Sequence, residues 1–176
     1  AKSGFNIKRP RVGLLNVGTE GHKGRSELQE AAELILESSK LFDFEYIGYV
    51  EGDDIPSSKL DVIVTDGFTG NIALKTGEGT ASLVRTLLKE TFAFSILARL
   101  ASILALTPLR ALKKRIDPRR VNGGVFLGLN GTIVKSHGSA DATGISAAIT
   151  LAYKLAQNDF QADLAKKIVS QKNISE

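Results

Sequence analysis

Short apolar runs alternate with glycine-rich loops and helical patterns, and this order most constrains the fold. The run "RVGLLNVG" (11–18) precedes a polar loop and then a segment whose apolar residues recur at helical spacing. The runs 44–50 and 60–66 are rich in the β-branched and aromatic residues typical of strands. Apolar strands that alternate with helices predict an α/β fold with a largely parallel sheet.

The second half of the chain predicts further elements. The segment 78–106 reads as one helix that continues until Pro108, and Asn130-Gly131 between two short apolar runs indicates a β-hairpin. A helix of small residues is predicted over 142–157, followed by a short terminal helix. The 176 residues therefore fit one domain of ordinary size or a large piece of a bigger one.

Composition excludes several kinds of chemistry. The chain has no cysteine and only two histidines, His22 and His137, which excludes disulfides and a cysteine nucleophile and leaves a zinc site short of ligands. Its start is basic without an apolar signal segment, so we expect a cytoplasmic protein. No methionine is present, and we expect a processed chain or one cut from a longer protein. The net charge of +4 permits an anionic partner.

Two glycine-rich loops leave apolar strands: "NVGTEGHKG" (16–24) and "TDGFTGNIALKTGEG" (65–79). Ligands of open α/β sheets collect at such loops, beyond the carboxyl ends of parallel strands. Glycines there let backbone N–H groups converge on an anion. Available side chains are the cations Lys23 and Lys75 and the hydrogen-bond donors Thr19, Thr69 and Asn71. These loops indicate a phosphate or acyl-oxygen site.

Plain turn chemistry is the alternative for the same loops. Neither loop fits the dinucleotide pattern GxGxxG or the phosphate loop GxxxxGK[ST]. Asp66 fits either a helix or turn cap or a catalytic role.

A third polar segment is "KSHGSADA" (135–142). His137, Ser139 and Asp141 are spaced too closely to align readily as a triad, and the chain has no GxSxG motif, so a serine hydrolase is not favoured. Ser139 or Asp141 is expected to cap the helix that begins near Ala142. His137 is either a ligand contact or a hydrogen-bonded turn residue.

Three motifs carry a resemblance to a known family. "PRVGLLNVGTEGHKG", "VIVTDGFTGNIALKTGEG" and "NGGVFLGLNGTIVKSHGSADA", in this order, closely resemble the C-terminal half of the PlsX family, the bacterial phosphate acyltransferases of phospholipid synthesis. The match covers nearly all of 10–157. We expect the whole of 1–176 to be that C-terminal half.

The resemblance implies transfer of a fatty acyl group from acyl carrier protein to inorganic phosphate. The acyl phosphate then serves a membrane glycerol-3-phosphate acyltransferase. It also implies a homodimer with a three-layer Rossmann-like fold similar to isocitrate and isopropylmalate dehydrogenases and to phosphotransacetylase. Phosphate and a thioester are both already reactive, so no cofactor or metal is expected.

Site residues follow from positions in the motifs. The resemblance places the catalytic pair at Lys23 and Asn71, although Gly21 and His22 precede Lys23 where relatives often carry charged residues. Substrate or phosphate binding is expected at Asn16, Gly18, Thr19, Asp66, Gly67, Thr69, Gly70, Lys75, His137, Gly138 and Ser139.

A protruding apolar and basic helical pair is expected within 85–120. The segment 91–106 has one charge, Arg99, and is too short to span a bilayer. The basic run "RALKKRIDPRR" (110–120) follows it and suits anionic headgroups or an acidic carrier protein. Peripheral membrane contact and dimer packing both remain open for Phe94, Ile96, Leu97, Leu100, Ile103 and Leu104.

Two rival functions also remain open. A phosphotransacetylase-like enzyme that acts on acyl-CoA fits the same loops, and a catalytically silent membrane or protein adaptor fits if the missing half is needed for activity. Nucleic-acid binding is not expected, because one basic run lacks interleaved aromatic residues.

Overall fold

The computed structural model describes residues 1–115, 117, 123–138 and 140–172. Its helices are α1 (Lys2–Phe5), α2 (Ser26–Leu41), α3 (Gly67–Ala93), α4 (Ile96–Leu104), α5 (Leu106–Arg115), α6 (Ala142–Gln157) and α7 (Phe160–Lys172). Its strands are β1 (Arg11–Leu15), β2 (Glu45–Val50), β3 (Val62–Val64), β4 (Gly124–Phe126) and β5 (Ile133–Lys135), with a 3-10 turn η1 (Gly52–Asp54). The chain divides into two compact units: unit 1 is Ala1–Ala73 with Ala162–Glu176, and unit 2 is Leu74–Gln161.

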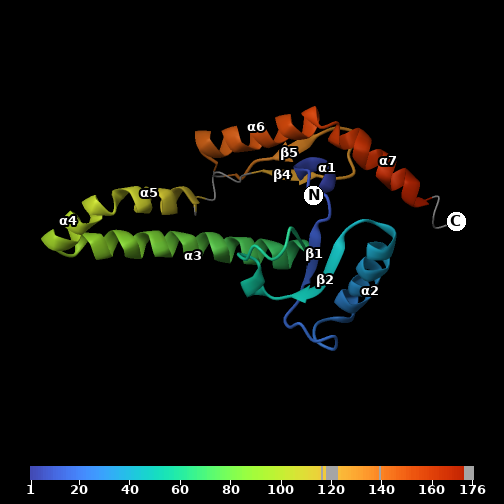
Figure 1. Ribbon diagram of the computed structural model, residues 1–176, viewed down its shortest axis with the longest axis horizontal. Helices are drawn as coiled ribbons and strands as arrows, with labels where there is room; N and C mark the ends of the chain where they lie inside the picture. The colour runs from blue at the N-terminus through green and yellow to red at the C-terminus, as the bar shows by residue number, and fades with distance from the viewer. Residues whose placement is uncertain (116, 118–122, 139, 173–176) are drawn as a thin grey trace. The chain divides into compact units, whose positions relative to one another are not determined.

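Unit 1 contains a parallel sheet in the order β2-β1-β3. Helix α2 connects β1 to β2 and packs against β2 (Figure 1). The central strand β1 supplies most of the core, where Val12, Leu14, Leu15 and Val50 are buried. The predicted α/β class with a parallel sheet is confirmed.

A bulge in β2 sets the register of this sheet. Val12 is opposite Tyr46, but the next residue, Gly13, is opposite Gly48, so Ile47 is the extra residue. Gly48 has φ +99°, a conformation that favours glycine. A Cβ atom on Gly13 would lie 2.7 Å from Cγ1 of Val50, so the absence of a side chain lets Val50 cover β1.

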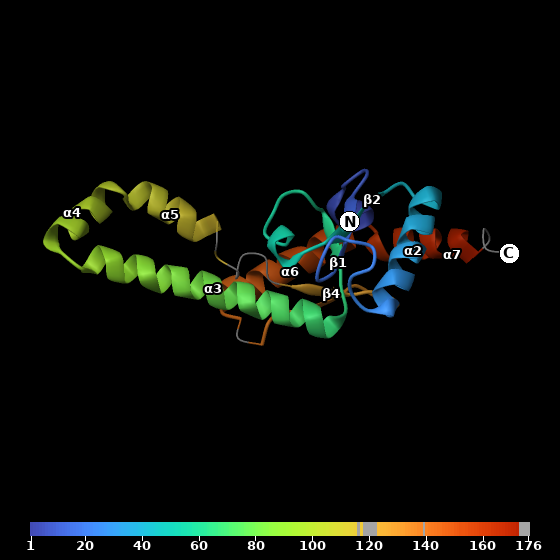
Figure 2. The same cartoon turned by 90° about the horizontal axis from the view of Figure 1, so that it is seen from below.

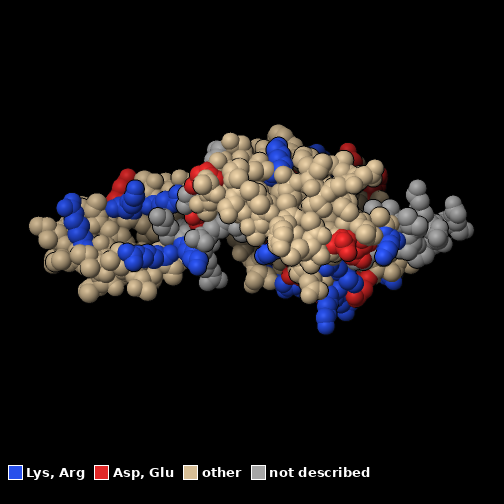
Figure 3. Space-filling model, turned by 90° about the horizontal axis from the view of Figure 1, so that it is seen from above, with Lys and Arg blue, Asp and Glu red and all other residues tan. Residues whose placement is uncertain are grey.

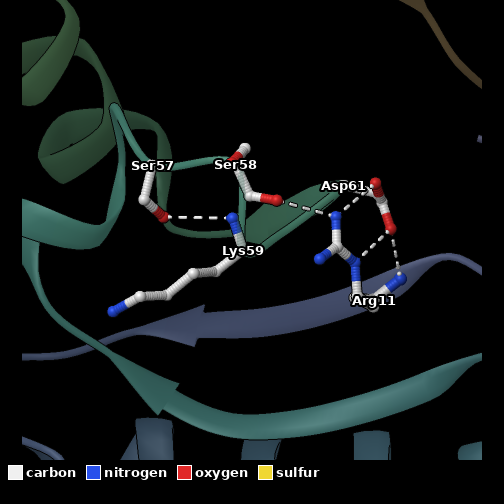
Figure 4. A network of polar contacts seen from close by, with 5 residues as sticks. All are labelled: Arg11, Ser57, Ser58, Lys59 and Asp61. Atoms are coloured by element: carbon white, nitrogen blue, oxygen red, sulfur yellow. Dashed lines mark hydrogen bonds and ion pairs between the residues drawn. The ribbon is translucent and has the colours of Figure 1, made fainter.

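An ion pair ties β1 to the segment before β3 (Figure 4). The Arg11 guanidinium donates from Nε to Oδ2 and from Nη2 to Oδ1 of Asp61, both at 3.0 Å, and the Arg11 backbone N–H also donates to Oδ2 at 2.8 Å. Nη2 donates further to the carbonyl oxygen of Ser58 at 2.9 Å. These donors lower the pKa of Asp61 to about 2, chiefly through the Arg11 side chain.

Unit 2 contains the antiparallel hairpin β4-β5, and α6 packs against β5. The predicted hairpin is confirmed. Asp141 caps α6, because its Oδ1 accepts from the backbone N–H of Gly144 at 3.0 Å. Asp141 is one of the two residues that the sequence predicted as the cap. Leu155 and Ala148 on α6 are buried and form the core of this unit with Phe160.

The predicted single helix over 78–106 is wrong in three respects. Helix α3 already begins at Gly67, the helix is interrupted at 94–95, and Pro108 lies inside α5. Ser95 starts α4, because its Oγ accepts from the N–H of Ala98 at 3.1 Å. Pro108 is tolerated because it occupies the first turn of α5, where a missing N–H costs nothing. Figures 1 and 2 show α5 running back alongside α3.

Candidate active site

The loop after β1 forms one side of the candidate site in unit 1. Asn16 directly follows β1 and is 7% exposed, and its backbone N–H donates to the carbonyl oxygen of Val50 at 2.9 Å. Its side-chain Nδ2 donates to the carbonyl oxygen of Lys23 at 2.9 Å. A turn that is closed by the Lys23 N–H and the Glu20 carbonyl oxygen, at 3.0 Å, completes the loop. The loop is therefore tied back to the end of the strand.

The side chain of Lys23 lies over Gly18, where a Cβ atom would collide with its Cδ. The Lys23 ammonium is 2.7 Å from Oε1 of Glu20, and both side chains are partly exposed. This hydrogen bond, followed by the carboxylate's charge, raises the pKa of Lys23, and the charge of Glu51 raises it further. The same hydrogen bond lowers the pKa of Glu20. Lys23 is thus fully charged at neutral pH and pairs with an internal anion.

The first turn of α3 forms the other side of the site. Asp66 precedes the helix, and its carboxylate accepts from the Thr69 N–H at 2.8 Å and from the Thr69 hydroxyl at 2.5 Å. These two hydrogen bonds, hydroxyl first, lower the pKa of Asp66, and the charge of Arg25 lowers it further. Asp66 therefore has the capping role that the sequence left open beside a catalytic one.

The glycines of this segment lie within the helix, not in a loop. Gly67 is the first residue of α3, and Gly70 follows one turn later. A Cβ atom on Gly70 would lie 2.8 Å from Cγ2 of Thr65, so the missing side chain lets the turn close on the end of β3. Asn71 is exposed on the next position of the helix.

Sheet topology explains why these two loops meet at one edge. Strands β1 and β3 are parallel neighbours, so both chains leave the sheet at the same end. Unit 1 therefore collects Asn16, Gly18, Thr19, Lys23, Asp66, Gly67, Thr69, Gly70 and Asn71 from the predicted set. A cation and a helix N-terminus at one sheet edge can bind an anion and stabilise negative charge on oxygen.

A second polar cluster lies within unit 2. The Lys75 ammonium donates to Nε2 of His137 at 2.6 Å and to Oε2 of Glu78 at 2.7 Å. Since ammonium is only a donor, Nε2 accepts and the proton of the neutral ring is on Nδ1. The Lys75 hydrogen bond lowers the pKa of Glu78. Lys75 and His137 thus contact each other, while Gly138 is in the turn that follows and Ser139 lies outside the described residues.

Three charged residues of the site were missed at the level of sequence. Glu20 pairs with Lys23, Glu51 acts on Lys23 through its charge, and Arg25 acts on Asp66 in the same way. The signal for Glu20 is its position three residues before Lys23 within a glycine-rich turn, and Arg25 immediately follows that motif. Within the part of the chain that the structure describes, no group of three His, Asp or Glu side chains could hold a metal ion.

The fold and this sheet edge define an α/β protein with a candidate anion site. Residues 1–163 match the family model described as "Fatty acid synthesis protein", and the chain belongs to this family. It is 65% identical over 168 residues to the phosphate acyltransferase of Paracoccus denitrificans and 64% identical over 170 residues to that of Ruegeria pomeroyi. The matches cover 96% and 97% of the chain but 45% and 46% of those relatives, so the chain spans about half their length. The resemblance stated from the sequence motifs is confirmed.

Proposed function

We propose that the chain forms the phosphate-binding part of an enzyme that transfers an acyl group from acyl carrier protein to inorganic phosphate. Its relatives of 65% and 64% identity bear the name phosphate acyltransferase. The observation that carries the proposal is that the loop with Lys23 and the capped start of α3 follow two neighbouring parallel strands at the same end of the sheet. We also propose that the parallel sheet that carries this site belongs to the three-layer Rossmann-like fold, similar to isocitrate and isopropylmalate dehydrogenases, that the resemblance implies.

The proposed reaction needs no cofactor. An oxygen of phosphate attacks the carbonyl carbon of the thioester, and a C–O bond forms to give a tetrahedral oxyanion. The oxyanion collapses, the C–S bond breaks, and sulfur leaves as a thiolate that takes a proton from solvent. The protein aligns the two reactants and stabilises the charge that develops on oxygen.

Lys23 and Asn71 take different roles in this scheme. The Lys23 ammonium holds phosphate by exchanging its Glu20 partner, whose carboxylate is 2.7 Å away and partly exposed. The amide of Asn71 donates to the oxyanion, supported by backbone N–H groups of the loops. Thr19, Thr69 and the glycines Gly18, Gly67 and Gly70 complete the proposed cradle.

The cluster in unit 2 is proposed to bind a second anionic group of the substrates. Lys75 carries the charge, His137 accepts from it, and Glu78 neutralises it when no ligand is present. Gly138 and Ser139 belong to this proposal by their positions beside His137.

An anionic membrane surface is the proposed occupant of the exposed apolar face on and beside α4. Phe94, Leu97 and Leu104 are 90%, 79% and 88% exposed, and Ile96, Leu100 and Ile103 are exposed beside them. In the described part of the chain, no helix is long and apolar enough to cross a membrane. Figure 3 shows Lys and Arg side chains beside this tan surface. Apolar side chains flanked by cations favour an interfacial position.

The proposal includes the remaining expected features: a homodimer, a cytoplasmic location at the membrane surface and delivery of acyl phosphate to a membrane glycerol-3-phosphate acyltransferase. Residues 116 and 118–120 of the predicted basic run lie outside the described residues, so the run supports membrane or carrier-protein contact only through residues such as Arg110 and Lys114.

The deciding experiment is release of free acyl carrier protein from palmitoyl-acyl carrier protein with and without inorganic phosphate. It uses the chain together with its native flanking sequence, and palmitoyl-CoA replaces the donor in a parallel reaction. Phosphate-dependent release that prefers the carrier protein supports the proposal. A preference for the CoA thioester would support the phosphotransacetylase alternative. No release from either donor would support the alternative of a catalytically silent membrane or protein adaptor.

A further inference from the structure

Asn16 is a buried polar residue of the candidate site. It is 7% exposed, and its Oδ1 is buried without a hydrogen-bond partner. Its Nδ2 donates to the carbonyl oxygen of Lys23, and its backbone N–H donates to Val50 of the neighbouring strand. A buried amide that satisfies only one of its two ends is uncommon, because an unpaired polar atom costs free energy.

Gly24 explains where the other end of this amide points. Oδ1 of Asn16 occupies the space in which a Cβ atom of Gly24 would lie. Gly24 also has φ +91°, a conformation that side chains disfavour. The amide of Asn16 therefore packs against residues 23 and 24, with its nitrogen on the Lys23 carbonyl and its oxygen against Gly24.

We propose that Asn16 is a positioning residue that acts on phosphate through Lys23. This inference rests on the proposed function, and it assigns Asn16 an indirect role, whereas the sequence expectation is that Asn16 binds substrate or phosphate itself. By holding the Lys23 carbonyl at the end of β1, Asn16 sets the point from which the lysine side chain extends across Gly18. The ammonium is thereby presented on the loop after β1, at the same end of the sheet as the start of α3.

The test measures binding of inorganic phosphate to the chain itself by the backbone amide NMR shifts of 17–25. Asn16→Ala removes the hydrogen bond to Lys23, and we expect it to weaken phosphate binding about tenfold. Gly24→Ala leaves every side-chain donor in place but displaces the Asn16 amide, so we expect a similar loss. Val50→Ala is the control, because it removes buried methyl groups from the same strand pair without touching the Lys23 carbonyl.

A double-mutant cycle separates positioning from a general loss of stability. In a Lys23→Gln background, Asn16→Ala should have no further effect on phosphate binding, because its action passes through Lys23. In the enzyme with its native flanking sequence, Asn16→Ala should raise the KM for phosphate and leave the KM for the acyl donor unchanged.

Each outcome decides one claim. Additive effects of Asn16→Ala and Lys23→Gln, or equal weakening by Val50→Ala, would overturn the positioning role. A wild-type chain that binds phosphate while Asn16→Ala binds it equally well overturns this inference and leaves the proposed function intact. Loop amides that ignore phosphate in the wild-type chain overturn both.

Discussion

The Lys23 ammonium lies in the same turn as the carboxylate of Glu20. The Glu20 carboxylate is 2.7 Å from the ammonium, so in the proposed site an incoming phosphate would compete with a group of the protein itself. Exposed ion pairs contribute little stability, which makes such an exchange inexpensive. The pair raises the pKa of Lys23 and keeps its ammonium beside Glu20.

Glu20→Gln should therefore tighten phosphate binding by up to about fivefold, since the competing pair is an exposed one. Titration of the chain with inorganic phosphate checks this expectation. Glu27→Gln on α2 removes the same charge from the next element and serves as the control. Weaker binding in Glu20→Gln than in the control would show that Glu20 supports the anion site rather than competing for it.

Lys23→Ala and Asn71→Ala should each lower turnover by about 100-fold or more, because in the proposed scheme Lys23 holds the phosphate and Asn71 donates to the oxyanion. Phosphate-dependent release of acyl carrier protein measures the effect. Lys40→Ala, which removes an exposed cation from α2, is the control and should leave turnover unchanged. Near-normal rates in either site variant would remove that residue from the catalytic pair.

Asp61 makes stability depend on pH. Its pKa in the folded chain is about 2, below the ordinary value of 3.8, because Arg11 donates to the carboxylate. The stabilisation is therefore fully present above the ordinary value and is lost as pH falls through the folded pKa. We expect Asp61→Asn to lower Tm at pH 6 and to flatten the acid side of the Tm profile.

Thermal unfolding between pH 2 and 7 measures this dependence. Asp53→Asn, at an exposed position of η1, is the matched control. Parallel profiles for wild type and Asp61→Asn would contradict the role of the Arg11 pair.

The glycine-rich segments after apolar strands made Lys23 and Asn71 candidates, and the family resemblance placed the catalytic pair there, which stays a prediction. It did not identify Glu20 or Arg25 as partners, since pairing depends on how a turn folds back on itself. The proposed role of Asn16 also depends on the backbone conformation of Gly24, whose positive φ could not be read from the sequence.

At the scale of elements, β1, β2, α2 and the hairpin were predictable from periodicity and turn residues. The start of α3 was not, because the glycines at 67, 70, 77 and 79 suggest a loop. Asp66 and Thr69 override that propensity by capping the first turn. The break before α4 was missed for a related reason, because a single serine, Ser95, is a weak signal for a helix start within a long apolar segment.

Leu97→Asp should lower binding to anionic vesicles about tenfold or more. The change removes a leucine that would enter the interface and adds a charge that anionic lipid repels. Its side chain is 79% exposed, so we expect no loss of folding. Co-sedimentation with phosphatidylserine-containing vesicles, with neutral vesicles in parallel, measures the effect.

Leu34→Asp is the control for this variant, because it makes the same change at an exposed leucine of α2. Equal binding by Leu97→Asp and Leu34→Asp would contradict the membrane proposal. A change in molar mass by light scattering, with unchanged vesicle binding, would assign the face to a second copy of the chain.

At the scale of the whole molecule, each unit has its own small core. Leu14 in unit 1 and Leu155 in unit 2 are each 1% exposed and are the largest fully buried side chains among the residues that the structure describes. Many other large apolar residues are exposed, including residues on α2, α3 and α4. The sequence shows which residues are apolar, but which of them are buried depends on tertiary packing. The pattern alone could therefore not separate the buried apolar residues from the exposed ones.

Leu14→Ala and Leu155→Ala should each lower the free energy of unfolding by about 2–5 kcal/mol, the usual cost of a leucine-sized cavity. Leu104→Ala, at a side chain that is 88% exposed, should change it by less than about 0.5 kcal/mol. Urea denaturation followed by circular dichroism measures all three. A Leu104→Ala loss as large as the buried ones would show that this face is covered in solution.

Two of the three glycines in the loop around Lys23, Gly18 and Gly24, have a consequence for variant libraries. Gly18 gives room to the lysine stem and Gly24 gives room to the Asn16 amide, although neither contributes a reacting group. In a saturation screen selected for growth, both positions should tolerate as few replacements as the lysine itself. Intolerance in such a screen would thus mark the shape of the turn as well as its chemistry.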